Sequence, residues 1–233
     1  KLIGSLNYLS TATRPEITYA VSILSQFLEN PVISHWKAGL QVLKYLNNTS
    51  TVGLKFKKHP EGHLNLVAYS DADWSNCPYS HRSITGLVCL NGGNLISWKS
   101  KKQQTVSLST TKAEYKGLTD TLKETLWLKN LINEIFLLKL NKIPIFNDNK
   151  GAIDLAYNLS NHNHFRTKHM DLRYHFVREK LEDETIELSH VSTINMLANF
   201  LTKSVGKSKL RIALNNLGIL SHADHGVLSK GGC

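Results

Sequence analysis

Three acidic residues stand in three separate motifs whose residue types suit metal chemistry. They are Asp71 in Tyr-Ser-Asp-Ala-Asp-Trp, Glu114 in Lys-Ala-Glu-Tyr and Asp148 in Phe-Asn-Asp-Asn. Each carboxylate falls at a predicted strand end or helix start, so a fold that gathers these ends would surround a cation with hard oxygen ligands. Such a cage suits Mg2+, which promotes phosphodiester hydrolysis. The motifs therefore predict a magnesium-dependent phosphodiesterase site.

Structural explanations compete with this prediction at each position. Thr111-Lys112-Ala113-Glu114 has the capping-box pattern, in which the glutamate bonds the backbone of the helix cap. Asp148 has the residue type of an N-cap for a following helix, and Asp71 could simply end a strand. Asp73 would share a strand face with Asp71 if the strand continued, which makes it an alternative ligand. The joint occurrence of the three motifs, rather than any single one, favours the metal site.

The first fifty residues have helical patterning. Pro15 suits a first helical turn, and apolar residues follow it at helical spacing. A second helix is predicted over residues 34–46. The Asn, Thr, Ser, Gly and Lys residues of 47–62 predict a connector with a short strand at 53–56. A domain boundary is therefore expected near residue 60.

After residue 60 the sequence alternates strand and helix patterns. Asn91-Gly92-Gly93 is a strong hairpin signal between two of the strands. The pattern predicts an antiparallel start followed by helices and further strands. The expected elements, in order, are strands 64–70, 84–90 and 94–99, a helical segment 111–138 of one or two helices, strand 143–147, helices 149–157 and 170–181, strand 184–190, helix 194–201 and a polar tail.

Composition restricts the class of protein. Lysine and arginine number 28 against 18 aspartate and glutamate residues, and the formal charge of +10 favours a polyanionic partner. Three cysteines do not suggest a zinc site or a disulfide framework, so a reducing intracellular setting is expected. No apolar run approaches the roughly 20 residues of a membrane helix. The chain starts at Lys1 rather than Met and is expected to be a piece of a longer polypeptide.

Eight further segments carry recognisable motifs in a fixed order: 69–74, 82–86, 96–103, 113–115, 148–149, 166–171, 174–179 and 201–203. Together they resemble the ribonuclease H domain of copia-type long-terminal-repeat retrotransposon Pol polyproteins. Residues 1–60 resemble the end of the preceding reverse transcriptase, but they contain no Tyr-X-Asp-Asp polymerase signature, so DNA synthesis is not expected.

The resemblance implies an α/β, ribonuclease H-like fold, with a five-stranded mixed sheet flanked by helices and preceded by a small helical segment. It implies three parts: a reverse transcriptase remnant at 1–60, the ribonuclease H-like domain at 61–205 and a tail at 206–233. The implied activity is two-metal hydrolysis of the RNA strand of RNA·DNA hybrids. One Mg2+ would activate water and the other would stabilise the leaving 3′ oxygen, with Mn2+ as a substitute. Asp71, Glu114 and Asp148 match three of the family's four carboxylates.

The fourth carboxylate position departs from the family. The family motif Ala-Asp-X-Leu-Thr-Lys has Asn199 in place of its aspartate in this chain. An amide oxygen can still contact a metal ion but contributes no negative charge to hold it. Weakened activity is therefore expected, and a catalytically degenerate transposon remnant that at most binds nucleic acid is the alternative. Lys112 replaces a common acid near the helix start, which is expected to affect stability more than chemistry.

The basic run after the hairpin is a candidate surface for nucleic acid. Contacts to phosphates supply affinity without sequence preference, while a solvated charged loop is the alternative explanation. The expected partners are the RNA·DNA hybrid and the remainder of a Pol polyprotein, with no membrane, in a cytoplasmic virus-like particle or the nucleus. The candidate contact residues are Trp98, Lys99, Lys101, Lys102, Gln103, Asn149, Arg166 and Lys168.

Overall fold

Five strands form one mixed sheet in the spatial order β4-β3-β2-β5-β6. The computed structural model describes residues 1–58, 64–75, 80–137, 140–158 and 168–221. Strands β2, β3 and β4 are antiparallel neighbours, whereas β5 runs parallel to both β2 and β6. The predicted five-stranded mixed sheet is confirmed. The strands are β2 (Leu66–Asp73), β3 (Ile84–Asn91), β4 (Asn94–Lys102), β5 (Ile143–Asn147) and β6 (Ile186–His190).

The sequence pattern underestimates two of these strands at their carboxyl ends. β2 continues to Asp73, so Asp71 lies inside a strand rather than at its end. β4 continues to Lys102, because β3 offers it a partner as far as the pair Ile84–Lys102. The hairpin between β3 and β4 turns at Gly92 and Gly93, whose φ angles of 53° and 73° suit the turn expected from the sequence.

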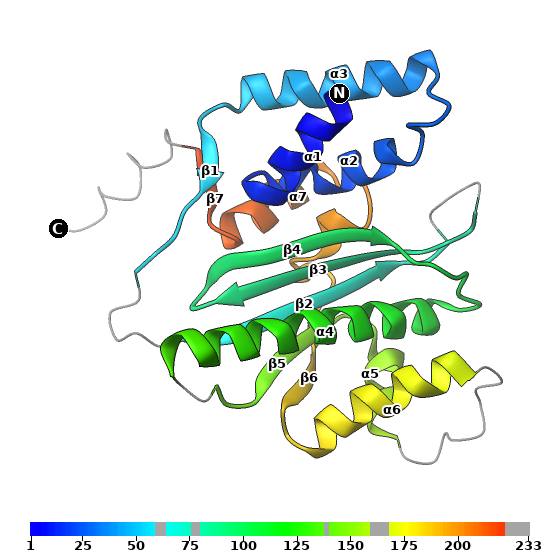
Figure 1. Ribbon diagram of the computed structural model, residues 1–233, viewed down its shortest axis with the longest axis vertical. Helices are drawn as coiled ribbons and strands as arrows, with labels where there is room; N and C mark the ends of the chain where they lie inside the picture. Colours follow the sequence, from blue (N-terminus) through cyan, green and yellow to red (C-terminus); the bar gives the residue numbers. More distant parts are fainter. Residues whose placement is uncertain (59–63, 76–79, 138–139, 159–167, 222–233) are drawn as a thin grey trace.

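Three helices cover one face of the sheet: α4 (Thr110–Phe136), α5 (Lys150–Tyr157) and α6 (Lys168–Glu182) (Figure 1). The segment predicted as one helix or two is the single helix α4. Its side chains Tyr115, Leu118 and Leu122 are fully buried against Ala68 and Ile145 of the sheet core. Burial of this apolar layer is the main contribution that holds α4 in place.

The other face of the sheet is covered by the C-terminal segment, which the sequence analysis assigned incorrectly in part. The helix predicted over 194–201 is only the short 3-10 helix η3 (Asn199–Leu201). The stretch after residue 206, predicted as a polar tail, contains helix α7 (Lys207–Asn216) and strand β7 (Ile219–Ser221). Leu214 and Leu217 pack there in a second core with Val88 of β3.

The N-terminal helices form a third, smaller core beyond this layer (Figure 1). They are α1 (Leu2–Ala12), the 3-10 helix η1 (Pro15–Ile17), α2 (Thr18–Ser25) and α3 (Ile33–Asn48). Of the apolar residues expected at helical spacing in the predicted helix 34–46, Trp36, Leu40 and Leu43 are exposed on α3, whereas Leu46 is buried. Leu46 and Val42 pack with the core of α1 and α2.

Two further contacts join this helical segment to the rest of the fold. The indole Nε1 of Trp98 on β4 donates a hydrogen bond of 2.7 Å to the Ser10 carbonyl. The short strand β1 (Val52–Leu54) pairs antiparallel with β7, with Gly53 opposite Leu220. Parts of the predicted segments 1–60 and 206–233 therefore share a two-stranded sheet. Among the described residues, no helix is long and apolar enough to cross a membrane.

Candidate active site

Asp71, Glu114 and Asp148 meet at one end of the central strands. Ligand oxygens of the three carboxylates all lie within 4.8 Å of one another. Asp71 projects from β2, and Asp148 directly follows β5. Because β2 and β5 are parallel and pair as far as Ser70 and Asn147, the next residue of each strand arrives at the same place. The sequence prediction that these three motifs converge agrees with the geometry.

The start of α4 supplies the third carboxylate. Ser109 is the N-cap and accepts a hydrogen bond from the Lys112 amide, so Glu114 lies in the second turn rather than in a capping box with Thr111. Asp148 is not a cap either, since Asn149 caps α5 by accepting from the Ala152 amide. Both capping alternatives for the acidic residues are therefore wrong.

Asp71 and Glu114 are buried and individually fixed by neighbours, whereas Asp148 is half-buried. The exposed fraction of Asp71 is 1% and that of Glu114 is 5%. The Asn147 side-chain amide donates to Glu114 Oε2 at 3.1 Å and to the Ser70 carbonyl at 3.0 Å. The Thr202 hydroxyl donates to Asp71 Oδ2. One oxygen of each buried carboxylate is thus held by the protein.

Burial makes the negative charge in this cluster costly. It is the largest cause that raises the pKa of Glu114 well above its ordinary value, and the nearby Asp71 carboxylate raises it further. Burial also raises the pKa of Asp71, although Lys203 and the Thr202 hydroxyl oppose the shift. The Lys203 ammonium nitrogen lies 3.9 Å from Asp71 Oδ2. Lys203 alone does not neutralise the three carboxylates. A cation at the centre of the cluster would relieve the repulsion that remains between them.

Asn199 lies beside this cluster and is part of its support. Its side-chain Nδ2 donates to the Thr193 carbonyl at 2.7 Å, and the Thr193 hydroxyl donates to Asp148 Oδ2 at 2.9 Å. The other side-chain atom, Oδ1, is buried and has no hydrogen-bond partner within the described part of the chain. Three clustered carboxylates are hard donors, so they fit a divalent cation such as Mg2+, and the unpartnered amide oxygen of Asn199 is a donor of the same kind.

The candidate nucleic-acid residues on and after β4 are divided between the two faces of the sheet. Lys99 pairs with Glu124 of α4, and Lys101 lies on the same side. Lys102 instead donates to the Gln26 side chain at 2.8 Å, on the side of the N-terminal helices where Trp98 also packs. This division follows from the two-residue period of a strand.

The other four candidates do not form one surface, because each has a different place in the fold. Gln103 is buried, and its amide donates to Thr85 and to the Ala113 carbonyl, so it fixes the chain before α4. Asn149 is the α5 cap described above. Arg166 lies outside the described residues, and Lys168 is the first residue of α6. The exposed cations Lys99 and Lys101 are therefore the β4 candidates that face solvent.

The sequence analysis gave no role to several residues that complete the site. Thr202 and Lys203 belong to the quoted Leu-Thr-Lys motif, and Asn147 immediately precedes Asp148, so their proximity to a candidate ligand was a usable signal. Thr193 carried no such signal, because its contact with Asp148 spans 45 residues of sequence.

Curated proteins are similar in sequence to nearly the whole of this chain. The chain is 39% identical over 220 residues to the Retrovirus-related Pol polyprotein from transposon TNT 1-94 of Nicotiana tabacum, an alignment that covers 94% of this chain and 16% of that protein. It is 37% identical over 219 residues to the corresponding polyprotein from transposon RE2 of Arabidopsis thaliana, covering 94% of this chain and 15% of that protein. No family model matches.

Among solved structures, LC11-RNase H1 in complex with RNA/DNA hybrid aligns with 59% of this chain and 94% of its own, at 13% identity and a TM-score of 0.45. The five-stranded mixed sheet with flanking helices is the arrangement that the resemblance to ribonuclease H implies. The chain spans about a sixth of the length of the curated relatives. The chain belongs to the Pol polyproteins of copia-type retrotransposons.

Proposed function

We propose that this chain is a metal-dependent nuclease of the ribonuclease H type, which hydrolyses the RNA strand of RNA·DNA hybrids during reverse transcription. The observation that carries the proposal is the meeting of Asp71, Glu114 and Asp148 from three separate elements, with ligand oxygens within 4.8 Å. Membership of the Pol family supports nuclease activity. Within this proposal the chain works as part of a longer Pol polyprotein, in a cytoplasmic virus-like particle or the nucleus.

The side chains of the site would bind and orient rather than react covalently. Asp71, Glu114 and Asp148 would hold two Mg2+ ions, with Mn2+ as a substitute. When bound, these ions supply the positive charge that acidifies an attacking water and stabilises the leaving oxygen. Thr202 and Asn147 each fix one carboxylate oxygen, which pre-organises the remaining oxygens toward the centre of the cluster.

Asn199 tunes this arrangement. It contributes no charge where the family has a carboxylate, so the net negative charge of the cluster is lower by one. Its amide also fixes Thr193, which in turn fixes Asp148. We therefore expect weaker metal affinity where Asn199 replaces the carboxylate, while Asp148 keeps its position.

The test is cleavage of a labelled RNA·DNA hybrid by the purified chain in Mg2+ and then in Mn2+. Asp71→Asn should abolish cleavage. Asp73→Asn is the matched control, because Asp73 lies on the same strand but outside the cluster, and it should retain activity. Cleavage that survives Asp71→Asn, or that disappears equally in both variants, would contradict the assignment of the site.

The alternative is a catalytically degenerate Pol segment that binds nucleic acid without cutting it. The specific observation in its favour is the amide of Asn199 at the fourth ligand position. A folded native chain that is inactive in both metals, together with cleavage gained by Asn199→Asp, would support the degenerate segment and identify the lesion.

A further inference from the structure

Four apolar side chains form a solvent-facing stripe along α3. They recur at the alternating spacing of three and four residues that defines a coiled-coil seam, with Ile33 and Leu40 at a positions and Trp36 and Leu43 at d positions. Each of these residues is between 42% and 75% exposed. The solvent-facing surface of a helix is normally polar, so a contiguous apolar stripe marks an interaction surface. These four residues are the α3 seam.

The packing of this chain uses a different side of α3. Gly39 and Leu46 are buried there: a methyl group built on Gly39 would lie 3.3 Å from Leu2 Cδ2, and Leu46 packs in the core with α1 and α2. Figure 1 shows α3 at the edge of the molecule, with α1 and α2 on its inner side. The helix therefore has two apolar sides, and the described part of the chain covers only the inner one.

Positive charge lies beside the α3 seam. Lys37 and Lys44 occupy its e positions, seven residues apart, and both are exposed. No residue of α3 is acidic. Residues 1–58 contain seven lysine and arginine residues against two glutamates, and one of the two, Glu16, pairs with Arg14. The seam therefore favours an occupant that carries apolar side chains and, beside them, negative charge.

A second copy of this chain fits the seam poorly. In an antiparallel pair of α3 helices, the e positions of the two copies face each other, so lysine would meet lysine. In a parallel pair, each e position faces a g position of the other helix. The g positions of α3 are Gly39 and Leu46, which are buried against the N-terminal core. Neither symmetric arrangement provides a counter-charge for the lysines.

Nucleic acid would account for the lysines but not for the seam. Bases stack on aromatic side chains, and Trp36 is the single aromatic residue of the four. The other three are aliphatic, and their spacing suits side chains of another helix that interlock with them. An amphipathic helix is therefore the better match to the whole surface.

We propose that the α3 seam docks an amphipathic helix of a protein partner, in which acidic side chains flank the apolar positions. Apolar side chains of that helix pack around Trp36 and Leu40, and its acidic side chains pair with Lys37 and Lys44. Burial of apolar surface supplies the affinity, while the complementary charges select the partner. The seam shares no residue with the acidic cluster, so docking there requires no nuclease activity.

The probe for this surface is a fluorescein-labelled synthetic peptide of about three heptads, with leucine at a and d and glutamate at e and g. Glutamate on both flanks keeps the peptide from pairing with itself. Fluorescence anisotropy in EDTA measures its binding to the full chain. We expect saturable binding, and about tenfold weaker binding of the same peptide with lysine in place of glutamate. No saturable binding of the acidic peptide, or equal binding of the two peptides, would overturn the proposal.

Trp36→Ala combined with Leu40→Ala truncates the centre of the seam and should weaken binding of the acidic peptide about tenfold or more. Trp127→Ala combined with Leu131→Ala is the matched control, because it makes the same changes at the same spacing on an exposed part of α4. The control should bind the peptide like the native chain. Equal losses in the two variants would refute docking at α3, and thermal melting checks that both are folded.

Lys37→Glu combined with Lys44→Glu tests the role of charge. This variant should prefer the lysine peptide to the glutamate peptide, which reverses the preference of the native chain. An unchanged preference would show that these lysines do not select the partner and would contradict the proposed pairing.

Two further measurements address the other occupants. Sedimentation velocity of the native chain should show no self-association that is removed by Trp36→Ala with Leu40→Ala, since such association would assign the seam to a second copy. The same variant should bind an RNA·DNA hybrid like the native chain, since a loss confined to this variant would assign the seam to nucleic acid. Either of these assignments would overturn the proposal.

Discussion

The Asn199 side chain lacks the charge of the family's aspartate, but its amide makes a hydrogen bond that supports the candidate site. Relative to the family pattern it lacks a charge, yet its Nδ2 donates to the Thr193 carbonyl and so supports the residue that holds Asp148. A carboxylate in the same orientation could not make that bond, because it would bring one acceptor against another. Restoring the family residue therefore has a structural cost as well as a chemical gain.

Asn199→Asp should destabilise the metal-free protein by about 1 to 3 kcal/mol, through the lost hydrogen bond and the added negative charge. Added Mg2+ should raise the melting temperature of this variant more than that of the native chain, because a fourth carboxylate strengthens metal binding. Thermal unfolding with and without Mg2+ measures both effects.

Asn195→Asp makes the same chemical change at an exposed position four residues away. It should leave both the metal-free stability and the response to Mg2+ close to native. An Asn199→Asp protein that is more stable than native in EDTA would contradict the role given to the amide.

The clustered residues show which parts of a candidate site a sequence can predict. Asp71, Glu114 and Asp148 were predictable because each lies in a distinctive motif, and Asn199 because it replaces an expected aspartate. The support from Thr193 was not, since it depends on how a loop approaches Asp148 in space. Gln103 was mistaken for a surface contact because its polar type gave no hint of burial.

Elements position these residues through close packing of backbone on backbone. Gly86 on β3 pairs with Asp71 on β2, and a methyl group built on it would lie 2.8 Å from the Ala198 carbonyl and 2.9 Å from Leu201 Cβ. This glycine therefore lets the segment that carries Asn199 and Thr202 approach the sheet. Gly117 on α4 differs, because a methyl group there would meet its neighbours at 3.4 Å or more.

Gly86→Ala should destabilise the protein by about 1 to 3 kcal/mol, because a backbone carbonyl cannot move aside as a flexible side chain can. It should also reduce hybrid cleavage, since η3 and Thr202 would be displaced from Asp71. Chemical unfolding and cleavage assays measure the two effects.

The matched control is Gly117→Ala, which should be neutral or stabilising by up to about 1 kcal/mol, because alanine favours a helix over glycine. Equal destabilisation by the two substitutions would show that the close approach at Gly86 has no special importance.

The contact between β3 and α4 has its own chemical reporter. Cys89 is fully buried beside Thr125, and burial raises the pKa of its thiol to about 12. The thiolate, and not the neutral thiol, is the form of cysteine that reacts with thiol reagents. A raised folded-state pKa means that the stability from the neutral thiol is present below its ordinary pKa of 9.0 and is lost as the pH rises toward about 12.

In a chain with Cys77→Ser and Cys233→Ser, Cys89 should react with a thiol reagent at pH 8 only as fast as the protein opens. The same variant in denaturant should react at once. Labelling over time, followed by mass spectrometry, gives both rates. Native labelling as fast as in denaturant would contradict the burial of this thiol between the sheet and α4.

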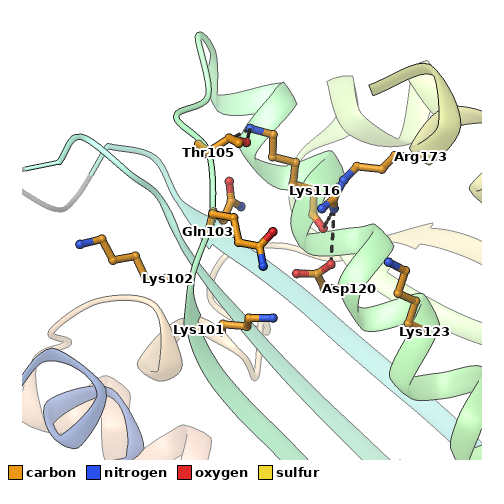
Figure 2. Close-up of a pocket in the computed structure, with 9 residues that line it drawn as sticks. Lys101, Lys102, Gln103, Thr105, Lys116, Asp120, Lys123 and Arg173 are labelled. Carbon is orange, nitrogen blue, oxygen red and sulfur yellow. Dashed lines mark hydrogen bonds and ion pairs between the residues drawn. The ribbon is translucent and has the colours of Figure 1, made fainter. Parts of the chain in front are cut away.

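Strand periodicity explains the main failure at the scale of elements. The cluster of lysines in Lys99-Ser100-Lys101-Lys102 looks like one basic patch in sequence, but the strand continues through it and sends alternate residues to opposite faces. An open pocket between β4 and α4 instead combines Lys101 with Lys116 and Lys123 of α4 and Arg173 of α6 (Figure 2). Such a combination depends on tertiary packing and has no signal in the local sequence.

The whole molecule is organised as layers joined by segments that are distant in sequence. The central sheet and α4 were predictable from their long patterns, whereas the integration of residues 207–221 was not. β7 has only three residues, and its partner β1 lies near the other end of the chain. Short strands with distant partners carry weak local signals.

Leu217→Ala tests whether this segment belongs to the fold. The side chain is 1% exposed in the core beneath β3, so its truncation should cost about 2 to 5 kcal/mol. Ile212→Ala, on α7 but 52% exposed, is the control and should cost about 0.5 kcal/mol or less. Chemical denaturation measures the change in the free energy of unfolding for each variant. If neither substitution changes it, residues 206–221 do not contribute to the core and are a tail.

The pairing of β1 with β7 also has a consequence for how a polyprotein containing this chain can be divided. The N-terminal helices are held by strand pairing with β7, by the Trp98 indole and by the Asn94 side chain, which bonds the Lys57 backbone. A protease cut between residues 58 and 64 would therefore leave two fragments bound as a non-covalent complex. Such a cut would break the covalent link without releasing residues 1–58 from the rest of the fold.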